Sequence, residues 1–292
     1  MHFTSGINRP PYEQRSGFLQ VTSGCSHASC AFCAYFKDSR FIKSDLDEIS
    51  ADIKEIPRYF GAPKRIFLQG ADAFAADYDV LMKIAEAIHE EVPSVETIGG
   101  YARIDNFTEK TIDQLRNMKA IGFSAPYIGV ESGDDAILKM VHKGYTAAEA
   151  REQLEKLDTA EWTYHVNFLN GVGGHNYGLS HAQKTAELYK GLHPALIDIA
   201  SLTLIPNTIL YRREQKGEFI EATEVERLEE LKEFLRLLEN ETIFQAYHVS
   251  NPFSCQTKIP ENKDKIMATL DSLINEVGEA QLSDYRHQIR MI

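Results

Sequence analysis

Short apolar runs that suit buried strands alternate with helical patterns along the first two thirds of the chain. These runs predict strands at residues 17–23, 64–70, 94–101, 125–132, 163–170 and 196–205. Between them, apolar residues recur at helical spacing and predict helices near residues 44–60, 77–91, 108–120, 134–141, 146–159 and 178–191. Alternating strands and helices, with a repeat of roughly 30 residues, indicate an α/β fold with parallel strands and crossover helices.

Side chains in the predicted strands alternate between an apolar face and a polar face. In the first strand, Leu19 and Val21 lie on one face and Gln20 and Thr22 on the other, and the fifth and sixth strands repeat this pattern. A doubly wound sheet meets helices on both faces, so both faces would be apolar. A polar face suits the lumen of an open barrel that holds a polar ligand. Because six units are too few for a closed eight-unit barrel, we expect a partial (β/α)6 TIM-type barrel.

The pattern changes beyond residue 222. Leucines at helical spacing predict an amphipathic helix at residues 223–239, followed by an extended stretch at 244–254 and another amphipathic helix. We therefore predict two domains. The first is the barrel with its N-terminal arm, residues 1–222, and the second is an α-rich extension, residues 223–292, that packs across the open side of the barrel.

The net charge of the chain limits the kinds of partner that it can bind. Its 292 residues carry a net charge of −12 and show no cluster of Lys and Arg, so nucleic acid is not an expected partner. No apolar run approaches the roughly 18 residues of a membrane span, and the N-terminus lacks the apolar core of a signal peptide. We expect a cytoplasmic protein with a small-molecule substrate and no membrane association.

Three of the four cysteines fall in the stretch GCSHASCAFCAYF, with the spacing C-x4-C-x2-C. They are Cys25, Cys30 and Cys33. Structural zinc usually takes four ligands, and the nearby histidine, His27, is squeezed between two of the cysteines. Thiolates hold [4Fe–4S] clusters, and three of them leave one iron open for chemistry. The spacing favours a cluster over zinc or inert thiols, and Cys255 is expected to be a lone thiol.

With this loop, residues 9–250 resemble the radical S-adenosylmethionine (radical SAM) superfamily. In that family a three-cysteine loop follows the first strand of a partial (β/α)6 barrel, and the open iron chelates S-adenosylmethionine. The usual spacing is C-x3-C-x2-C, so the first gap here is one residue longer. The chain is most similar to the Elp3/MiaB/NifB-type proteins and oxygen-independent coproporphyrinogen III oxidase, and a queuine lyase is similar in size and architecture.

The resemblance implies a [4Fe–4S] cluster on the three cysteines and a set of S-adenosylmethionine contacts. Phe32 stands where an aromatic side chain lies against the adenine. In GVESGDDAILKMVHKG, Glu131 resembles the carboxylate that binds the ribose hydroxyls, and Lys143 the cation that pairs with the methionine carboxylate. The other implied contacts follow the second, third and fifth strands: Gly70, Asp72, Tyr101, Arg103, Asn167 and Asn170.

The resemblance also implies that a flavodoxin or ferredoxin supplies one electron and that a 5′-deoxyadenosyl radical abstracts hydrogen from the substrate. One remaining cysteine is too few for a second cluster, which argues against sulfur-inserting chemistry. We predict a small polar metabolite, most specifically queuine in a lyase reaction. The alternatives are oxidative decarboxylation of coproporphyrinogen and, in a different class, a non-catalytic zinc-binding protein. The candidate substrate contacts are Gln20, Tyr127, His165, Asn167, Ser201, Thr203, Tyr247 and His248.

Overall fold

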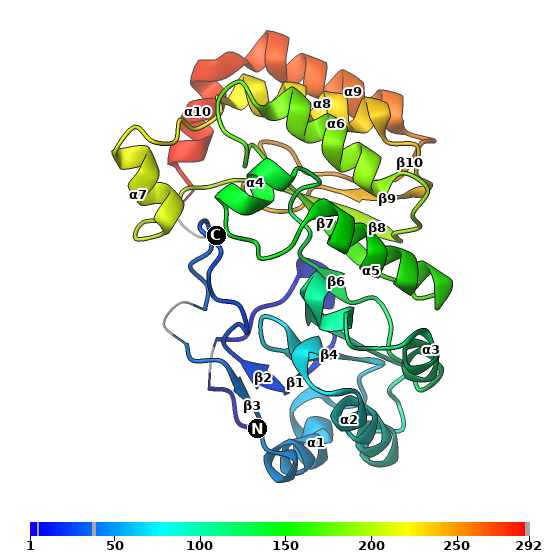
Figure 1. The fold of residues 1–292 in the computed structure, drawn as a ribbon. Coiled ribbons are helices and arrows are strands. Elements are labelled where there is room, and N and C mark those ends of the chain that lie inside the picture. Colours follow the sequence, from blue (N-terminus) through cyan, green and yellow to red (C-terminus); the bar gives the residue numbers. More distant parts are fainter. Residues whose placement is uncertain (5, 37–38, 290–292) are drawn as a thin grey trace. The chain divides into compact units, whose positions relative to one another are not determined.

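The computed structural model describes residues 1–4, 6–36 and 39–289, and it has the predicted α/β architecture with mostly parallel strands (Figure 1). The described chain divides into two compact units. The first unit comprises Met1–Ala28, Tyr35–Gly129 and Gln153–His165, and the second comprises Ser29–Ala34, Val130–Glu152 and Val166–Ile292. Among the described residues, none of the helices is both long enough and apolar enough to cross a membrane.

The first unit contains four parallel strands in the order β1-β4-β5-β6. The strands are β1 (Gly17–Gln20), β4 (Arg65–Gln69), β5 (Thr97–Ala102) and β6 (Tyr127–Ile128). The helices that follow β1, β4 and β5 are α1 (Leu46–Phe60), α2 (Tyr78–Glu91) and α3 (Ile112–Ala120). A small antiparallel pair, β2 (Thr22–Ser23) with β3 (Ile42–Lys43), flanks the cysteine loop in the sequence.

Local sequence explains how these helices begin and end. Asp45 caps α1 by accepting a hydrogen bond from the backbone N–H of Asp47, and Gly61 follows its last residue with a φ of 66°. Thr111 and Gln114 form a capping box at the start of α3. The apolar faces of the helices cover the strands, whose side chains Leu19, Ile66 and Leu68 are fully buried.

Strand β6 is much shorter than the strand predicted at residues 125–132. Ala125 has a φ of 49° and Glu131 a φ of 69°, so the backbone turns out of the extended conformation on both sides of Tyr127–Ile128. Neither residue is a glycine, and the sequence therefore gives no sign of these turns.

The second unit contains β7 (His165–Asn170), β8 (Leu196–Ser201), β9 (Thr242–Gln245) and β10 (Gln256–Ile259), although His165 itself belongs to the first unit. Strand β9 pairs with β8 in parallel and with β10 in antiparallel. The helices are α4 (Asp135–Met140), α6 (Gly178–Tyr189), α7 (Ile209–Gln215), α8 (Glu224–Leu237), α9 (Lys263–Ser272) and α10 (Gly278–His287). Helix α5 (Ala147–Thr159) contributes to both units.

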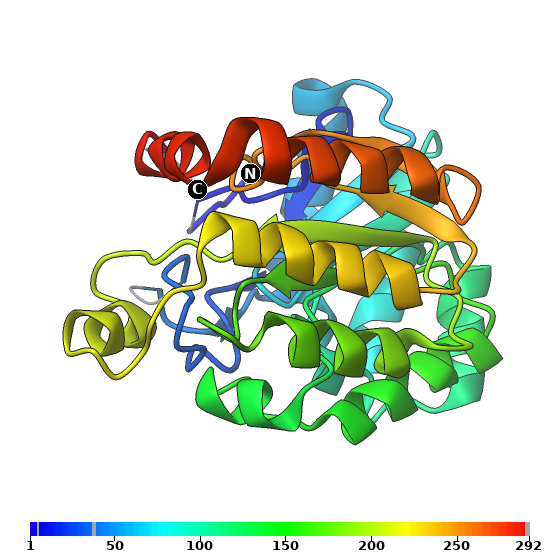
Figure 2. The same ribbon diagram turned by 90° about the horizontal axis from the view of Figure 1, so that it is seen from above.

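Helices α6, α8 and α9 lie side by side in the second unit (Figure 2). Phe234 of α8 stacks on Phe168 of β7, with ring centroids 4.3 Å apart. The predicted boundary between residues 222 and 223 falls inside this unit and stays a prediction as a domain boundary. The tail beyond it also supplies two strands, β9 and β10, in addition to the predicted helices.

Candidate functional site

The cysteine loop begins in the first unit beside a glycine that nothing larger can replace. Gly70 follows β4 with a φ of 118°, and a Cβ on it would lie 2.0 Å from Thr22 Oγ1. The next residue, Ala71, donates its backbone N–H to Gly24 O at 3.2 Å. The turn after β4 is thereby held against the residue that precedes Cys25.

Asp72 is buried against the same loop. Its carboxylate accepts hydrogen bonds from the backbone N–H of Ser26, at 3.3 Å, and from the Ser26 hydroxyl. Burial raises the pKa of Asp72, and burial together with the nearby Asp72 charge raises the pKa of the Cys25 thiol. The predicted cofactor residue Asp72 therefore holds the cysteine loop in the structure, through a serine that the sequence analysis missed.

The predicted cofactor residues Tyr101 and Arg103 lie at the carboxyl end of β5. The Tyr101 ring makes edge-to-face contacts with Phe67 at 5.2 Å and with the predicted substrate residue Tyr127 at 5.5 Å. Arg103 is buried and forms a bidentate pair with Asp105, through Nε–Oδ1 at 2.9 Å and Nη2–Oδ2 at 2.8 Å.

Two buried glutamines occupy the carboxyl ends of β1 and β4. Gln20, a predicted substrate contact, pairs in register with Gln69. Their side-chain oxygens accept backbone hydrogen bonds from the N-terminal arm, Gln20 from Thr4 at 2.8 Å and Gln69 from Asn8 at 3.2 Å. The sequence analysis missed Gln69, although the Gln at the end of each of the two strands was a visible signal.

His165 lies at the opposite strand ends from the cysteine loop of its unit. It lines a pocket of about 640 Å³ at the amino ends of β1, β4 and β5, together with Arg65 and Thr97. Its Nδ1 lies 3.1 Å from the hydroxyl of Tyr12, and burial lowers its pKa to about 4. The structure therefore separates this predicted substrate contact from the residues at the carboxyl ends.

In the second unit, residues 29–34 of the cysteine loop are anchored by backbone hydrogen bonds. Ala31 donates to Val141 O at 2.8 Å, and Ala31 O accepts from Leu210 N at 2.9 Å. Cys30 is buried, and Phe32 packs against an apolar cluster built from α4, α7 and the end of β7. The loop is thus fixed through the backbone of Ala31 and the packing of Phe32.

Glu131, Lys143 and Asn167 come together as a buried polar group in the second unit. Lys143 Nζ lies 2.9 Å from Glu131 Oε1 and 6.0 Å from the centre of the Phe32 ring. Asn167 Oδ1 accepts from the backbone N–H groups of Val130, at 2.8 Å, and Glu131, at 3.0 Å. Asn167 Nδ2 donates to Glu131 Oε2 at 2.6 Å. Asn167 therefore holds both the backbone and the carboxylate of Glu131, whose φ is 69°.

The other predicted contacts of this unit gather around the ends of β7 and β8. Asn170 donates to Ser201 Oγ at 3.4 Å, and His248 Nδ1 lies 2.7 Å from Ser250 Oγ. Tyr247 is exposed at 43% of its surface. The hydroxyl of Thr203 lies 3.4 Å from Arg286 Nη1. The structure adds three residues that sequence patterns did not identify: Ser250, Asn251 and Arg286.

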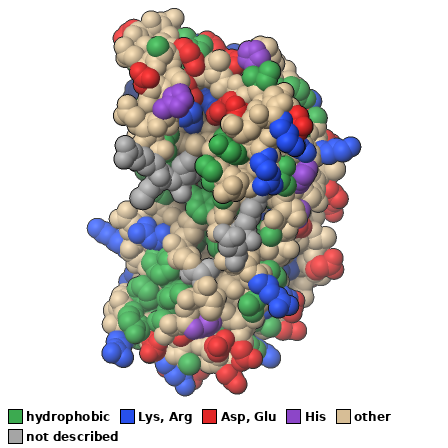
Figure 3. Space-filling model, turned by 90° about the vertical axis from the view of Figure 1, so that its left-hand side faces the viewer, with side chains coloured by type: hydrophobic (Ala, Val, Ile, Leu, Met, Phe, Trp, Pro, Cys, Tyr) green, Lys and Arg blue, Asp and Glu red, His purple; other side chains and the backbone are tan. Residues whose placement is uncertain are grey.

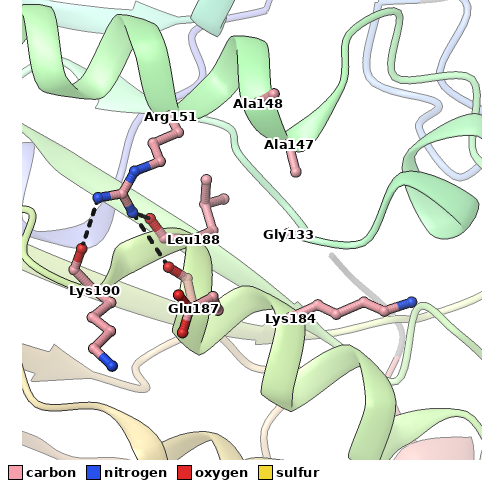
Figure 4. Close-up of a pocket in the computed structure, with 8 residues that line it drawn as sticks. All are labelled: Gly133, Ala147, Ala148, Arg151, Lys184, Glu187, Leu188 and Lys190. Atoms are coloured by element: carbon pink, nitrogen blue, oxygen red, sulfur yellow. Dashed lines mark hydrogen bonds between the residues drawn. The ribbon is translucent and has the colours of Figure 1, made fainter.

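A separate surface pocket of about 370 Å³ lies in the second unit between the start of α5 and the end of α6 (Figure 4). The Arg151 guanidinium crosses it and donates to the carbonyls of Glu187, Leu188 and Lys190 at 3.3, 3.0 and 3.1 Å. Because these are the last carbonyls of α6, Arg151 acts as a helix cap. The pocket holds none of the predicted site residues.

The cysteines fit an iron–sulfur cluster by their chemistry. All four are reduced thiols, and Cys25 belongs to the first unit while Cys30 and Cys33 belong to the second. Within the described part of the chain, no three His, Cys, Asp or Glu side chains are grouped as a metal site. Three thiols on one short loop, without a fourth strong ligand, suit a cluster with one open iron better than structural zinc.

The part of the chain that is similar to known proteins includes the cysteine loop. A model of the radical SAM superfamily matches residues 19–189, more than half of the chain. The chain is 26% identical over 163 residues to a tRNA-2-methylthio-N(6)-dimethylallyladenosine synthase of Dehalococcoides mccartyi, covering 52% of this chain and 36% of that protein. It is 26% identical over 170 residues to the synthase of Idiomarina loihiensis, covering 53% and 33%. The match thus spans about a third of the length of these curated relatives.

Solved structures show the same fold. The radical S-adenosylmethionine methyltransferase TsrM from Kitasatospora setae aligns with a TM-score of 0.56 and 17% identity, over 73% of this chain and 43% of that one. Methylornithine synthase (PylB) aligns with a TM-score of 0.54 and 12% identity, over 94% and 87%. Elp3 from Methanocaldococcus infernus aligns at 0.51 and 15%, over 87% and 63%. These likenesses confirm the predicted partial TIM-type barrel.

Proposed function

Because this chain belongs to the radical SAM superfamily and is a radical SAM enzyme, we propose that it acts on a small polar metabolite. The most specific candidate is a modified base of the queuine type, cleaved in a lyase reaction. Membership in the superfamily implies a [4Fe–4S] cluster and S-adenosylmethionine as cofactors. It also removes the alternative of a non-catalytic zinc-binding protein.

The residues that would hold the cofactors divide between the loop and the strand ends. Cys25, Cys30 and Cys33 would ligate the cluster, which together with S-adenosylmethionine supplies the 5′-deoxyadenosyl radical when bound. Glu131 offers the carboxylate for the ribose hydroxyls, and Asn167 presets its position through three hydrogen bonds. Lys143, 2.9 Å from Glu131, is the cation available to the methionine carboxylate.

The observation that carries the substrate proposal is the neutral character of the polar groups at the carboxyl ends of the strands. In the first unit they are the amides of Gln20 and Gln69, and in the second unit they are Asn170 and Ser201, with Asn251 hydrogen-bonded to Ser201. The carboxyl ends are where enzymes with β/α barrels build their sites. Amides and hydroxyls suit the donors and acceptors on the edge of a nucleobase, which protein sites read by hydrogen bonds.

Three basic side chains are already committed to other groups, which disfavours a porphyrinogen. Arg103 pairs with Asp105 and Arg286 with Glu224, and Lys143 is the cation proposed for the methionine carboxylate. A tetracarboxylate such as coproporphyrinogen would need several uncommitted cations. Coproporphyrinogen remains the second compound to be tested.

The net charge of the protein favours a free base over a base within RNA as the substrate. The curated relatives are named for a modified adenosine of tRNA, which supports a purine-like substrate. This chain, however, carries a net charge of −12. On the face shown in Figure 3, basic and acidic side chains are interspersed. The net negative charge of the chain repels the phosphates of a polynucleotide. A flavodoxin or ferredoxin is the proposed electron donor.

The decisive experiment is an anaerobic assay of the cluster-loaded protein with dithionite and S-adenosylmethionine. Release of 5′-deoxyadenosine would be measured with queuine, coproporphyrinogen and an unmodified tRNA. We expect stimulation by queuine and a cleaved product in the mass spectrum. Stimulation by coproporphyrinogen alone would overturn the base assignment, and stimulation by tRNA alone would overturn the small-molecule proposal.

A further inference from the structure

A chain of side-chain hydrogen bonds joins the ends of β7 and β8 to the segment that follows β9. Asn251 Nδ2 donates to Ile199 O at 2.7 Å, and Asn251 Oδ1 lies 3.0 Å from Ser201 Oγ. Ser201 Oγ is in turn 3.4 Å from Asn170 Nδ2. Asn170, Ser201 and Asn251 are each 4% exposed or less. All of these residues belong to the second unit.

The direction of every hydrogen bond in this chain follows from one carbonyl. Ile199 O can only accept, so Asn251 must turn Nδ2 toward it and Oδ1 toward Ser201. The Ser201 hydroxyl must then donate to Asn251, and its oxygen is left to accept. Asn170 must therefore turn Nδ2 toward Ser201, which fixes an amide orientation that is otherwise ambiguous.

This order leaves one polar atom without a partner at the end of the hydrogen-bond series. Asn170 Oδ1 is buried and has no hydrogen-bond partner among the residues that the structure describes. An unpaired buried polar group of this kind destabilises the folded protein. Three other oxygens of this unit are in the same state. Those of Asn240 and Thr242 lie just before or at the start of β9, away from the carboxyl ends. The third, Glu230 Oε2, belongs to a carboxylate whose other oxygen accepts from Gly171 N at 3.0 Å, so only Asn170 leaves its sole side-chain acceptor unused at the carboxyl ends.

We propose that Asn170 Oδ1, which the family resemblance had assigned to S-adenosylmethionine, is instead a substrate-recognition acceptor that takes an N–H or O–H donor from the substrate. Ser201 and Asn251 orient this acceptor, so the segment after β9 shapes the specificity of the barrel. The proposal rests on the proposed function and narrows it to substrates that present a ring N–H, an amino group or a hydroxyl. A carboxylate or an unprotonated ring nitrogen would face the oxygen lone pairs and be repelled.

The first test needs no substrate and compares thermal unfolding of the protein without substrate. Asn170→Leu keeps the side-chain shape and removes the unpaired oxygen, so its melting temperature should equal or exceed that of the unmodified protein. Ser201→Ala should lower it, because Asn251 Oδ1 then loses its donor. Asn240→Leu is the matched control, since the Asn240 amide donates to the carbonyls of Tyr189 and Leu192 at 2.8 and 2.7 Å. A loss in Asn170→Leu as large as in Asn240→Leu would make Asn170 a structural link and overturn the proposal.

The second test uses queuine as the probe, titrated by anaerobic calorimetry into cluster-loaded protein saturated with S-adenosylmethionine. Asn170→Leu should weaken queuine binding about 10- to 100-fold while the affinity for S-adenosylmethionine is unchanged. Unchanged queuine affinity, or a loss of S-adenosylmethionine affinity instead, would overturn the assignment. If the unmodified protein does not bind queuine, the base proposal fails, and the unfolding comparison decides alone on Asn170.

Discussion

The two ends of the strands use polar side chains in opposite ways. At the amino ends in the first unit, Arg65 donates to Glu13 at 2.9 Å, to Thr97 and Ser124 O at 3.2 Å, and to Ala125 O at 3.1 Å. The partly buried cation is thus neutralised and surrounded by acceptors. His165 beside it is held neutral, with its pKa lowered to about 4 by burial and by the Arg65 charge.

At the carboxyl ends of the second unit, the backbone is strained and a polar group is left over. Glu131, which is not a glycine, adopts a φ of 69°, and the buried Asn170 has an unpaired oxygen. Such features are costly in the folded protein and are found mainly at functional sites. We therefore expect Arg65 with its full set of acceptors to serve stability, and the region of Glu131 and Asn170 to serve binding.

The largest expected effect comes from the cysteine loop. Cys30→Ala should abolish incorporation of the cluster, because a [4Fe–4S] cluster with two protein thiolates is poorly held. Iron content after anaerobic reconstitution measures this. Cys255→Ala is the control and should retain full iron, since that thiol is isolated and burial raises its pKa to about 11. Full iron in the Cys30→Ala protein would disprove the cluster assignment.

The next effect would show that the amino ends serve stability. Arg65→Met removes the cation and leaves the buried Glu13 carboxylate unpaired, which typically costs about 3–5 kcal/mol. The free energy of unfolding in urea should fall by this amount, while the affinity for S-adenosylmethionine stays within about twofold. A large loss of affinity in a protein of normal stability would break the comparison.

A smaller effect on stability, with a large effect on binding, is expected at Glu131. Glu131→Gln keeps the shape and removes the charge-assisted hydrogen bonds to the ribose, worth roughly 1.5–3 kcal/mol or about 10- to 150-fold in affinity. Calorimetry with S-adenosylmethionine on the cluster-loaded protein measures this, and Lys143→Met should behave similarly. Arg65→Met serves as the control from the other strand end. Normal affinity in both variants would refute the assignment of this pair.

The smallest effect is the pH dependence that His165 confers. Its pKa is about 4 in the folded protein, against an ordinary value of 6.5, so the unfolded chain binds the proton more tightly. Above pH 6.5 this histidine is neutral in both the folded and the unfolded chain and lowers the stability of neither. As the pH falls toward 4, protonation of the unfolded chain lowers the free energy of unfolding, by roughly 2 kcal/mol at pH 5. Urea unfolding at pH 7 and pH 5 should show a smaller loss in His165→Phe than in the unmodified protein. Equal losses would show that His165 is not buried as the structure has it.

Local periodicity was enough to predict the repeated strands and helices, and the spacing of Cys25, Cys30 and Cys33 was enough for the cofactor class. Backbone turns without glycine and contacts between residues far apart in the sequence could not be predicted. Ala125 and Glu131 take left-handed conformations without being glycines, so the short β6 had no sequence signal. Asn251 reaches Ser201 across 50 residues of chain, a pairing that depends on tertiary packing. Residue types in a strand likewise could not place His165 at the amino ends.

Because Glu131 has a left-handed backbone conformation, the residue that suits folding best at this position differs from the residue that suits catalysis. A selection experiment would detect this difference. Asparagine and glycine accept that conformation more readily than glutamate does. Substitution by either would relieve strain while removing the carboxylate. The buried Lys143 would lose its partner in either variant, which opposes this gain. In a saturation library sorted for soluble expression, asparagine and glycine should therefore be the best-tolerated replacements at position 131. Sorted for catalytic output, the same position should become one of the least tolerant in the chain.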